Sequence, residues 1–111
     1  MSDTSRDRLF LDDILARIER IEAYTQGGKA EFFASMLIQD GVIRSLEVIG
    51  EAAKRLSPEL RSAHPAIPWR QLAGLRDVLI HNYGNVDPNE VWNIIERDLP
   101  GIKLQRLAIV V

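Results

Sequence analysis

The sequence predicts an all-α protein, an antiparallel bundle of about five helices, and three observations support this fold class. Apolar residues recur at steps of three and four along most of the chain, which is the period of an α-helix. Helix-starting and helix-ending residue pairs divide these stretches into segments joined by short connections. The alternating pattern of a half-buried strand does not occur in the sequence. The length of 111 residues is typical of one domain, which we assign to residues 1–111.

The first half of the chain predicts two helices joined by a glycine turn. The first helix is expected to start near Thr4 or Ser5 and to reach about Tyr24. Its buried stripe consists of Leu11, Ile14, Ile18 and Ile21. Gly27-Gly28 permits a reversal, and a long second helix follows over residues 30–56. Because this second helix is apolar over most of its circumference, we expect it at the centre of the bundle or at a subunit interface.

The second half of the chain predicts shorter helices. Ser57-Pro58 pairs a capping hydroxyl with a proline suited to the first helical turn, and the short helix it starts is expected to end near residues 64–65. The next helix is expected from Pro68 to about Tyr83. A capping pattern at Asp87-Pro88 predicts another helix start. Pro100-Gly101 is expected to interrupt that helix, and the tail to add one short helix.

Composition narrows the possible chemistry. The chain has no cysteine, which excludes disulfides, thiolate nucleophiles and cysteine-ligated zinc, and fits a reducing cytoplasm. It has only 2 histidines, which give little basis for a histidine-based site, so no metal is expected. No apolar run approaches the ~20 residues that span a bilayer, so we expect a cytoplasmic protein without membrane contact.

Charge is distributed unevenly along the chain. The net charge of −2 argues against a broadly basic nucleic-acid surface. Residues 54–76 nevertheless contain Lys54, Arg55, Arg61, Arg70 and Arg76 against a single acid. An RNA-facing patch is one interpretation of this basic run, and a solvated surface is the more frequent one.

Four residues near the end of the 68–83 helix form the candidate site: Arg76, Asp77, His81 and Tyr83. Cleavage of RNA by its own 2′-hydroxyl needs a proton acceptor, a proton donor and a cation that stabilises negative charge on the phosphate. Histidine exchanges protons near neutral pH, and the guanidinium fork of arginine fits a phosphate. Asp77 lies one turn before His81 and is therefore placed to hold one ring nitrogen and fix the tautomer.

Helix geometry makes a site within one chain difficult. Arg76 and His81 lie about 140° apart around a helix, so they converge poorly unless the helix unwinds or a second copy faces the first. Two copies about a twofold axis would bring two histidines and two arginines to one cleft. An arginine and a histidine at this spacing are, however, more often a surface arginine and a half-buried histidine. The spacing without other information predicts only a helical bundle.

The segment 76–83 resembles the Arg-x4-His-x-Tyr motif of HepT-like proteins in the HEPN superfamily. Residues 39–54 resemble the second helix of this family, and residues 67–75 resemble its approach to the motif. Val86-Asp87 and the helix around Trp92 also fit, so the resemblance covers most of the chain. A combination of this length is far more specific than the motif by itself.

The resemblance implies a homodimeric, metal-independent endoribonuclease that needs no cofactor and is the toxin of a type II toxin–antitoxin system. Arg76 and His81 correspond to the catalytic pair, and Asp77 to their polar companion. Tyr83 corresponds to the tyrosine that the antitoxin, a minimal nucleotidyltransferase, modifies with AMP. An adenylyl group there would block RNA by its bulk and repel the RNA backbone by its charge. The alternative is a non-catalytic helical partner or substrate-binding subunit of such a nucleotidyltransferase.

Other side chains with possible chemistry are assigned to structure. His64 precedes a proline in a loop and is expected to be a surface histidine. Trp69 and Trp92 fit helix-packing positions better than base-stacking positions. Glu47 and Glu51 lie one turn apart, and either line the dimer cleft and support the catalytic arginine or face solvent.

Overall fold

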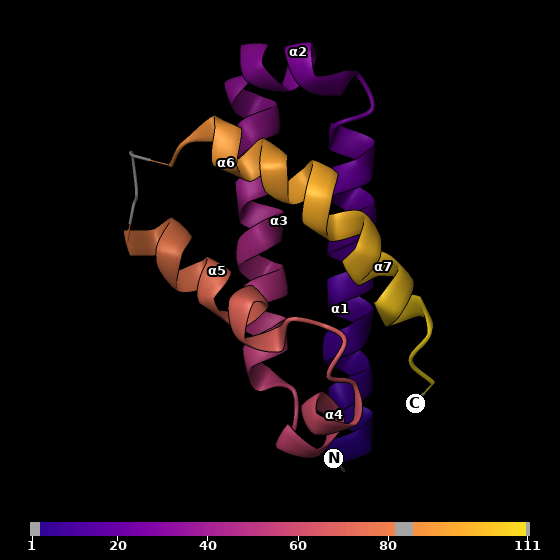
Figure 1. Cartoon of the computed structure of the whole chain (residues 1–111). Coiled ribbons are helices and arrows are strands. Elements are labelled where there is room, and N and C mark those ends of the chain that lie inside the picture. Colours follow the sequence, from indigo (N-terminus) through magenta and orange to yellow (C-terminus); the bar gives the residue numbers. More distant parts are fainter. Residues whose placement is uncertain (1–2, 82–85, 111) are drawn as a thin grey trace.

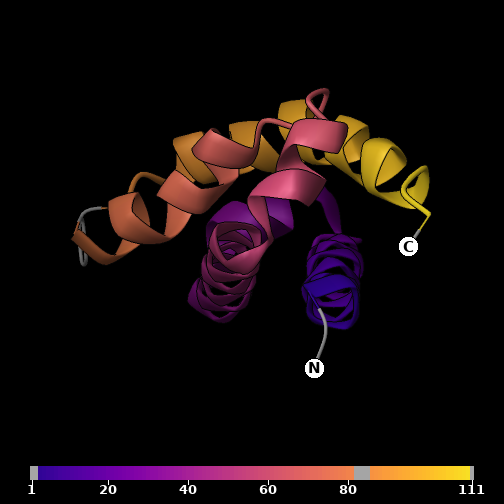
Figure 2. The same ribbon diagram turned by 90° about the horizontal axis from the view of Figure 1, so that it is seen from below.

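The computed structural model describes the backbone of residues 3–81 and 86–110 and the side chains of residues 5–75 and 86–110. Its helices form two layers (Figure 1, Figure 2). One layer is the antiparallel pair α1 (Asp3–Tyr24) and α3 (Met36–Arg55), joined at one end by α2 (Gly28–Ala34). The other layer lies across one face of this pair. It consists of α4 (Pro58–Ala63), α5 (Trp69–His81), α6 (Pro88–Asn93), the π-helical segment η1 (Ile94–Asp98) and α7 (Leu99–Leu107).

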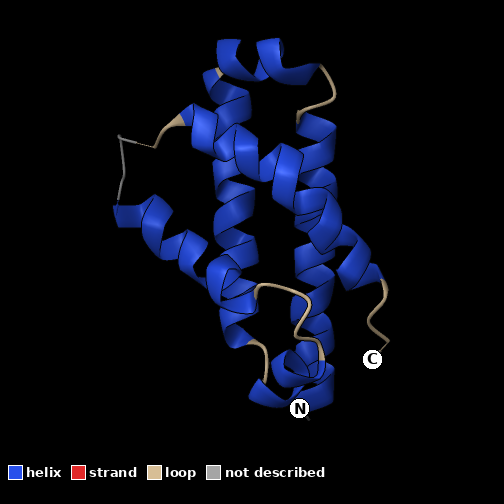
Figure 3. Cartoon of the chain, viewed as in Figure 1, coloured by secondary structure: helices blue, strands red, loops and turns tan. Residues whose placement is uncertain are grey.

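All regular structure in the described part of the chain is helical, which confirms the predicted fold class (Figure 3). The described segments outnumber the five or so helices expected, because the second expected helix is divided and a π-helical joint adds a segment near the C-terminus. Within the described residues, no helix combines the length and apolar character needed to cross a membrane.

The core lies between the two layers and along the contact of α1 with α3. The apolar stripe predicted for the first helix is buried, and α3 contacts both α1 and α5. Full burial of one such apolar side chain contributes about 1.5–3 kcal/mol. The largest fully buried apolar side chains are Phe32, Leu11, Ile14, Ile18, Ile21, Leu46, Ile49, Val42 and Val91.

The glycine turn predicted after the first helix is confirmed. α1 ends at Tyr24, and the Thr25 hydroxyl donates to the Ile21 carbonyl (2.7 Å), which satisfies an acceptor at the helix end. Gly28 has a φ of 87°, a left-handed conformation that favours glycine because other residues carry a Cβ. The chain reverses there and enters α2.

The single helix predicted over residues 30–56 is wrong, because the chain leaves helical geometry at Ser35. Ser35 is extended (φ −120°, ψ 109°), and its hydroxyl oxygen accepts the Ile38 N–H (3.1 Å) as the N-cap of α3. The Gln39 amide donates to the Phe32 carbonyl (3.0 Å), which gives the end of α2 a partner. This break turns Phe32 into the core, where it is 1% exposed.

The predicted interruption at Pro100-Gly101 is also wrong. Helical backbone continues from α6 through η1 into α7, and both residues lie inside α7. The Leu99 N–H donates to the Ile94 carbonyl, five residues back, as in the wide turn of a π-helix. Pro100 then falls in the first turn of α7, directly after this wide turn.

Two polar contacts tie distant segments to α1. The Asp7 carboxylate, 5% exposed, accepts the Ser57 N–H (2.8 Å) and the Ser57 hydroxyl (2.6 Å), and so holds the start of α4. Arg106, 9% exposed, donates from Nε to the Leu11 carbonyl (2.7 Å) and pairs with Asp12 (3.0 Å). These contacts fix the second layer on the first.

Candidate active site

The N-terminal half of α5 is held firmly in the bundle. The helix begins at Trp69, one residue later than predicted, and the carbonyl of Pro68 before it accepts the Leu72 N–H (3.0 Å). The Trp69 indole N–H donates to the His64 carbonyl (2.9 Å) and attaches the start of α5 to the loop after α4. Leu72 and Trp69 are buried, and the helix packs along α3. These contacts set the direction in which the rest of α5 leaves the bundle.

Three of the four predicted site residues lie in the last turns of α5. Arg76, Asp77 and His81 belong to this helix, which the structure describes as far as His81. Their side chains are outside the described part, so the contact between Asp77 and His81 stays a prediction. Tyr83, and with it the predicted end of the helix, lies outside the described residues.

α5 runs outward from the pair of long helices in both views, so that its C-terminal end lies at the flank of the bundle, away from α1 (Figure 1, Figure 2). The backbone from residue 76 to residue 81 is helical. Positions 76 and 81 are therefore about 140° apart around the axis. Either unwinding of the helix or a second copy of the chain could bring the arginine and the histidine together. The helix is not unwound within residues 76–81, which leaves the second copy.

The two acids considered in the sequence form ion pairs along α3. Glu47 Oε2 lies 3.5 Å from Arg44 Nη1, and Glu51 Oε1 lies 2.8 Å from Arg55 Nε. Both acids are half-buried and line a groove between α1 and α3. They are therefore not simply solvent-facing acids, and their support of Arg76 stays a prediction.

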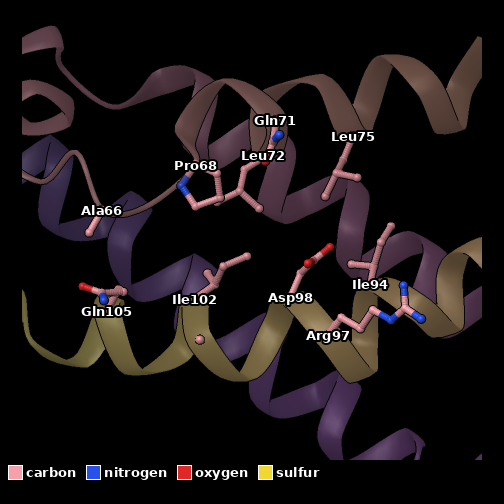
Figure 4. A pocket seen from close by; sticks show the side chains of 11 residues that line it. Ala66, Pro68, Gln71, Leu72, Leu75, Ile94, Arg97, Asp98, Ile102 and Gln105 are labelled. Carbon is pink, nitrogen blue, oxygen red and sulfur yellow. The ribbon is translucent and has the colours of Figure 1, made fainter.

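A cavity of about 300 Å³ lies between α5 and the helical stretch from η1 to α7 (Figure 4). The Asp98 carboxylate points into it from η1, and Leu75, which directly precedes the motif, lies on its α5 side. Much of the remaining wall is apolar. The cavity borders the motif, but the described α5 residues that line it include no proton-transfer group. Its lining residues are Ala66, Pro68, Gln71, Leu72, Leu75, Ile94, Arg97, Asp98, Gly101, Ile102 and Gln105.

The two tryptophans pack within the bundle as predicted, and His64 is less exposed than expected. The Trp92 ring lies 5.3 Å from the Phe32 ring, and its indole N–H donates to Glu96 (2.8 Å). His64 was expected to be a surface histidine but is half-buried at the end of α4, where its backbone carbonyl accepts the Trp69 indole N–H. Among the described side chains, no group of three or more His, Cys, Asp or Glu residues is arranged to hold a metal ion.

The structure separates the basic run of residues 54–76 into different surroundings. Arg55 pairs with Glu51 on α3, whereas Arg61 and Arg70 line one hollow between α4 and α5. Sequence reasoning did not identify this hollow, because the two arginines are nine residues apart with a proline-containing loop between them. The local excess of basic residues was the only sequence signal for it.

Comparison with known proteins gives consistent matches. The sequence profile described as "Ribonuclease HepT-like" matches residues 14–109. A probable ribonuclease HepT of Thermococcus cleftensis is 42% identical over 95 residues, which are 85% of this chain and 86% of that protein. A putative RNase of Caldanaerobacter subterraneus subsp. tengcongensis is 36% identical over 99 residues, 88% of each chain.

A third relative is longer than this chain. A gamma-glutamylcyclotransferase and putative RNase of Methanocaldococcus jannaschii is 42% identical over 103 residues, which are 92% of this chain and 46% of that protein. The chain thus spans less than half the length of this relative. No solved structure matches the chain.

Proposed function

Because the chain belongs to the ribonuclease HepT-like family, we propose that it is a metal-independent ribonuclease of the cytoplasm, the toxin of a type II toxin–antitoxin system. The observation that carries this proposal is the position of the Arg-x4-His-x-Tyr motif. The matched region, residues 14–109, contains the whole motif, and Arg76 and His81 belong to the outward end of α5. A helix end at the flank of the bundle is a place that RNA can reach.

In the proposed reaction, His81 takes the proton of a ribose 2′-hydroxyl, and the 2′-oxygen attacks the adjacent phosphorus. The bond from phosphorus to the 5′-oxygen breaks, and the leaving oxygen receives a proton from a second histidine. One product carries a 2′,3′-cyclic phosphate and the other a 5′-hydroxyl. Arg76 binds the phosphate oxygens, on which negative charge grows in the transition state. Asp77 orients the imidazole of His81.

The second histidine comes from a second copy of the chain. One chain supplies a single histidine in the motif, and the helical backbone separates it from Arg76 by about 140°. The end of α5 lies at the flank of the bundle, where the same helix of a partner subunit can face it about a twofold axis. A homodimer therefore provides two histidines and two arginines around one phosphate.

Tyr83 is the proposed control point. It follows His81 by two residues, so a group attached to it lies next to the catalytic pair. The antitoxin, a minimal nucleotidyltransferase, would transfer AMP to its hydroxyl. The added phosphodiester brings bulk and a negative charge, and both oppose the approach of RNA.

The first test is RNA cleavage in the presence of EDTA. We expect the purified protein to cut RNA into products with 2′,3′-cyclic phosphate ends and to leave 2′-O-methyl RNA intact, since the latter lacks the nucleophile. Arg76→Ala should lower the rate about 100-fold or more, because a charge-stabilising group is lost. Arg20→Ala, an exposed arginine on α1, is the matched control. Loss of cleavage in EDTA, or products with 3′-hydroxyl ends, would contradict the proposal.

A second test separates the toxin from the non-catalytic partner considered as its alternative. Expression without the antitoxin should arrest growth if the chain cuts RNA and should be harmless if it only docks on a nucleotidyltransferase. Co-expression with the nucleotidyltransferase should add the mass of AMP to the intact protein. Tyr83→Phe should abolish this increment, whereas Tyr24→Phe, which removes the other tyrosine of the chain, should retain it. An increment that survives Tyr83→Phe would place the modification elsewhere.

A further inference from the structure

A basic hollow lies on the surface between α4 and α5, separate from the residues of the motif. Its lining combines two arginines, one hydroxyl and a tryptophan, without a carboxylate among the described lining residues: Pro58, Arg61, Ser62, Trp69, Arg70 and Ala73. Two guanidinium groups in one hollow repel each other unless an anion lies between them. The hollow therefore has the charge of an anion-binding site.

Arg61, which lines this hollow, has an unsatisfied donor. Its Nε is buried and has no hydrogen-bond partner among the described residues. By contrast, the Nε of Arg55 and the Nε of Arg106 each donate to an oxygen. A buried donor without an acceptor costs about 1–3 kcal/mol, and most buried donors in proteins have a partner. An oxygen-rich ligand in the hollow would supply the missing acceptor once the Arg61 side chain turns this covered Nε toward it.

Arg70 is the second cation of the hollow and is exposed on the first turn of α5. It forms no ion pair among the described residues. The acid nearest in sequence to Arg61 is Glu59, two positions earlier on α4. Residues two apart on a helix point about 200° away from each other, so Glu59 does not neutralise the hollow.

The hollow shares one face of α5 with positions 77 and 81 of the motif, whereas position 76 lies at about −120° from Arg70. Counting about 100° per residue from Arg70, Ala73 lies at about −60°, and positions 77 and 81 lie at about −20° and +20°. At about 1.5 Å per residue, position 81 lies about 16 Å along the helix axis from Arg70. A single RNA strand a few nucleotides long can follow this face from one end to the other.

We propose that the hollow binds a backbone phosphate of the RNA strand that is cleaved at the end of α5. This inference rests on the proposed function. Arg61 and Arg70 donate to the phosphate oxygens, and the Ser62 hydroxyl supplies a further donor. The hollow thus positions the strand a few nucleotides from the scissile bond. Arg61 and Arg70 are phosphate-binding residues and take no part in the chemistry.

Binding of a labelled 2′-O-methyl oligonucleotide, measured by fluorescence anisotropy over a range of salt concentrations, tests this inference with the intact protein. Arg61→Gln/Arg70→Gln removes two phosphate contacts. The slope of log K against log salt should then fall in magnitude by about 1.4, which corresponds to about 25-fold weaker binding at 0.1 M salt. Arg20→Gln/Lys29→Gln removes the same charge from α1 and α2, at the end of the bundle opposite α4, and should leave the slope unchanged.

Two further variants keep the test independent of folding. Arg70→Gln changes an exposed residue, and should weaken binding about 5-fold by the same relation. Arg61→Lys/Arg70→Lys keeps both charges and should keep the wild-type slope. Equal binding and equal slopes for the two glutamine double variants, or no binding by the wild-type protein, would overturn the inference.

The outcome also separates this inference from the proposed function. If the wild-type protein cleaves RNA but the two double variants bind alike, the ribonuclease stands and the hollow is not a phosphate site. If the wild-type protein leaves RNA intact but the Arg61→Gln/Arg70→Gln variant has lost binding, the hollow binds RNA and the ribonuclease proposal fails.

Discussion

Replacement of Asp7 by alanine tests how the second layer, which includes α5, is attached to the first. The Asp7 carboxylate accepts both the N–H and the hydroxyl of Ser57, 50 residues away, at 2.8 and 2.6 Å. Ser57 in turn caps α4, because its hydroxyl oxygen accepts the Leu60 N–H (3.2 Å). One buried carboxylate thus fixes the start of the segment that leads into α5.

The size of the effect follows from these two bonds. A hydrogen bond to a charged group contributes about 1.5–3 kcal/mol. Ser57 is half-buried, so water replaces part of what is lost, and we expect Asp7→Ala to lower the free energy of unfolding by about 3 kcal/mol. For a domain of this length, that corresponds to a fall in Tm of about 12 °C. Asp7→Asn keeps the shape and one acceptor and should cost about 1 kcal/mol.

Thermal and urea unfolding followed by circular dichroism measure these changes. Asp13→Ala is the matched control, because Asp13 is exposed on the same helix, and should change the free energy by less than about 0.5 kcal/mol. A Tm of the Asp7→Ala variant within about 2 °C of the wild-type value would refute the argument that this contact holds α4.

Three further predictions concern other contacts of the fold. Arg106→Met removes the guanidinium bonds to the Leu11 carbonyl and the Asp12 carboxylate and should lower the free energy of urea unfolding by about 2–3 kcal/mol, while an unchanged midpoint would show that these bonds add nothing net. The hydrogen bond that the Lys103 ammonium donates to the Glu22 carboxylate raises the pKa of Lys103 above 10.5, so Glu22→Gln should lower the pKa measured by NMR titration. Because the folded-state pKa is raised, the stabilisation by this pair is present below about pH 10.5 and is lost as the pH rises above that value. A difference in stability between the wild-type protein and Glu22→Gln that persists unchanged into stronger alkali would contradict this prediction. Gly28→Ala places a Cβ at a φ of 87° and should cost about 1 kcal/mol, measured as a fall in Tm of about 4 °C, and an equal Tm would show that the turn relaxes without strain.

Local signals in the sequence predicted the parts of the fold that local physics determines. The stripe of the first helix has the 3.6-residue period and is buried as expected. Ser57 and Asp87 cap α4 and α6 as predicted, because each side chain is adjacent to the N–H groups that it satisfies. Such contacts depend on residues two or three positions apart and can be recognised without the fold.

The features that were missed depend on contacts between residues farther apart. Ser35 interrupts an apolar run that contains no glycine or proline near it, and the break is stabilised by the bond from Gln39 back to Phe32, seven residues earlier. Pro100 normally ends a helix, but the π-helical turn of η1 places it in the first turn of α7. The period of the apolar residues predicts neither the break at Ser35 nor the continuous helical backbone through Pro100.

The candidate site also combines features that the sequence predicted with features that depend on contacts between distant residues. The motif and its place near the end of a helix followed from the sequence and the resemblance, and α5 extends through Arg76, Asp77 and His81. The outward course of α5 depends on how the layers pack, and the hollow with Arg61 and Arg70 exists only because α4 and α5 meet. The convergence of Arg76 and His81 stays a prediction that needs two chains.

The two histidines of the chain offer the most direct test of the ribonuclease. His81→Ala should lower the rate of RNA cleavage in EDTA by about 100- to 10,000-fold, because it removes the group that transfers protons. His64→Ala makes the same chemical change at the end of α4, where the backbone carbonyl rather than the imidazole holds Trp69, and should leave cleavage unchanged. Full activity of a folded His81→Ala protein would contradict the account.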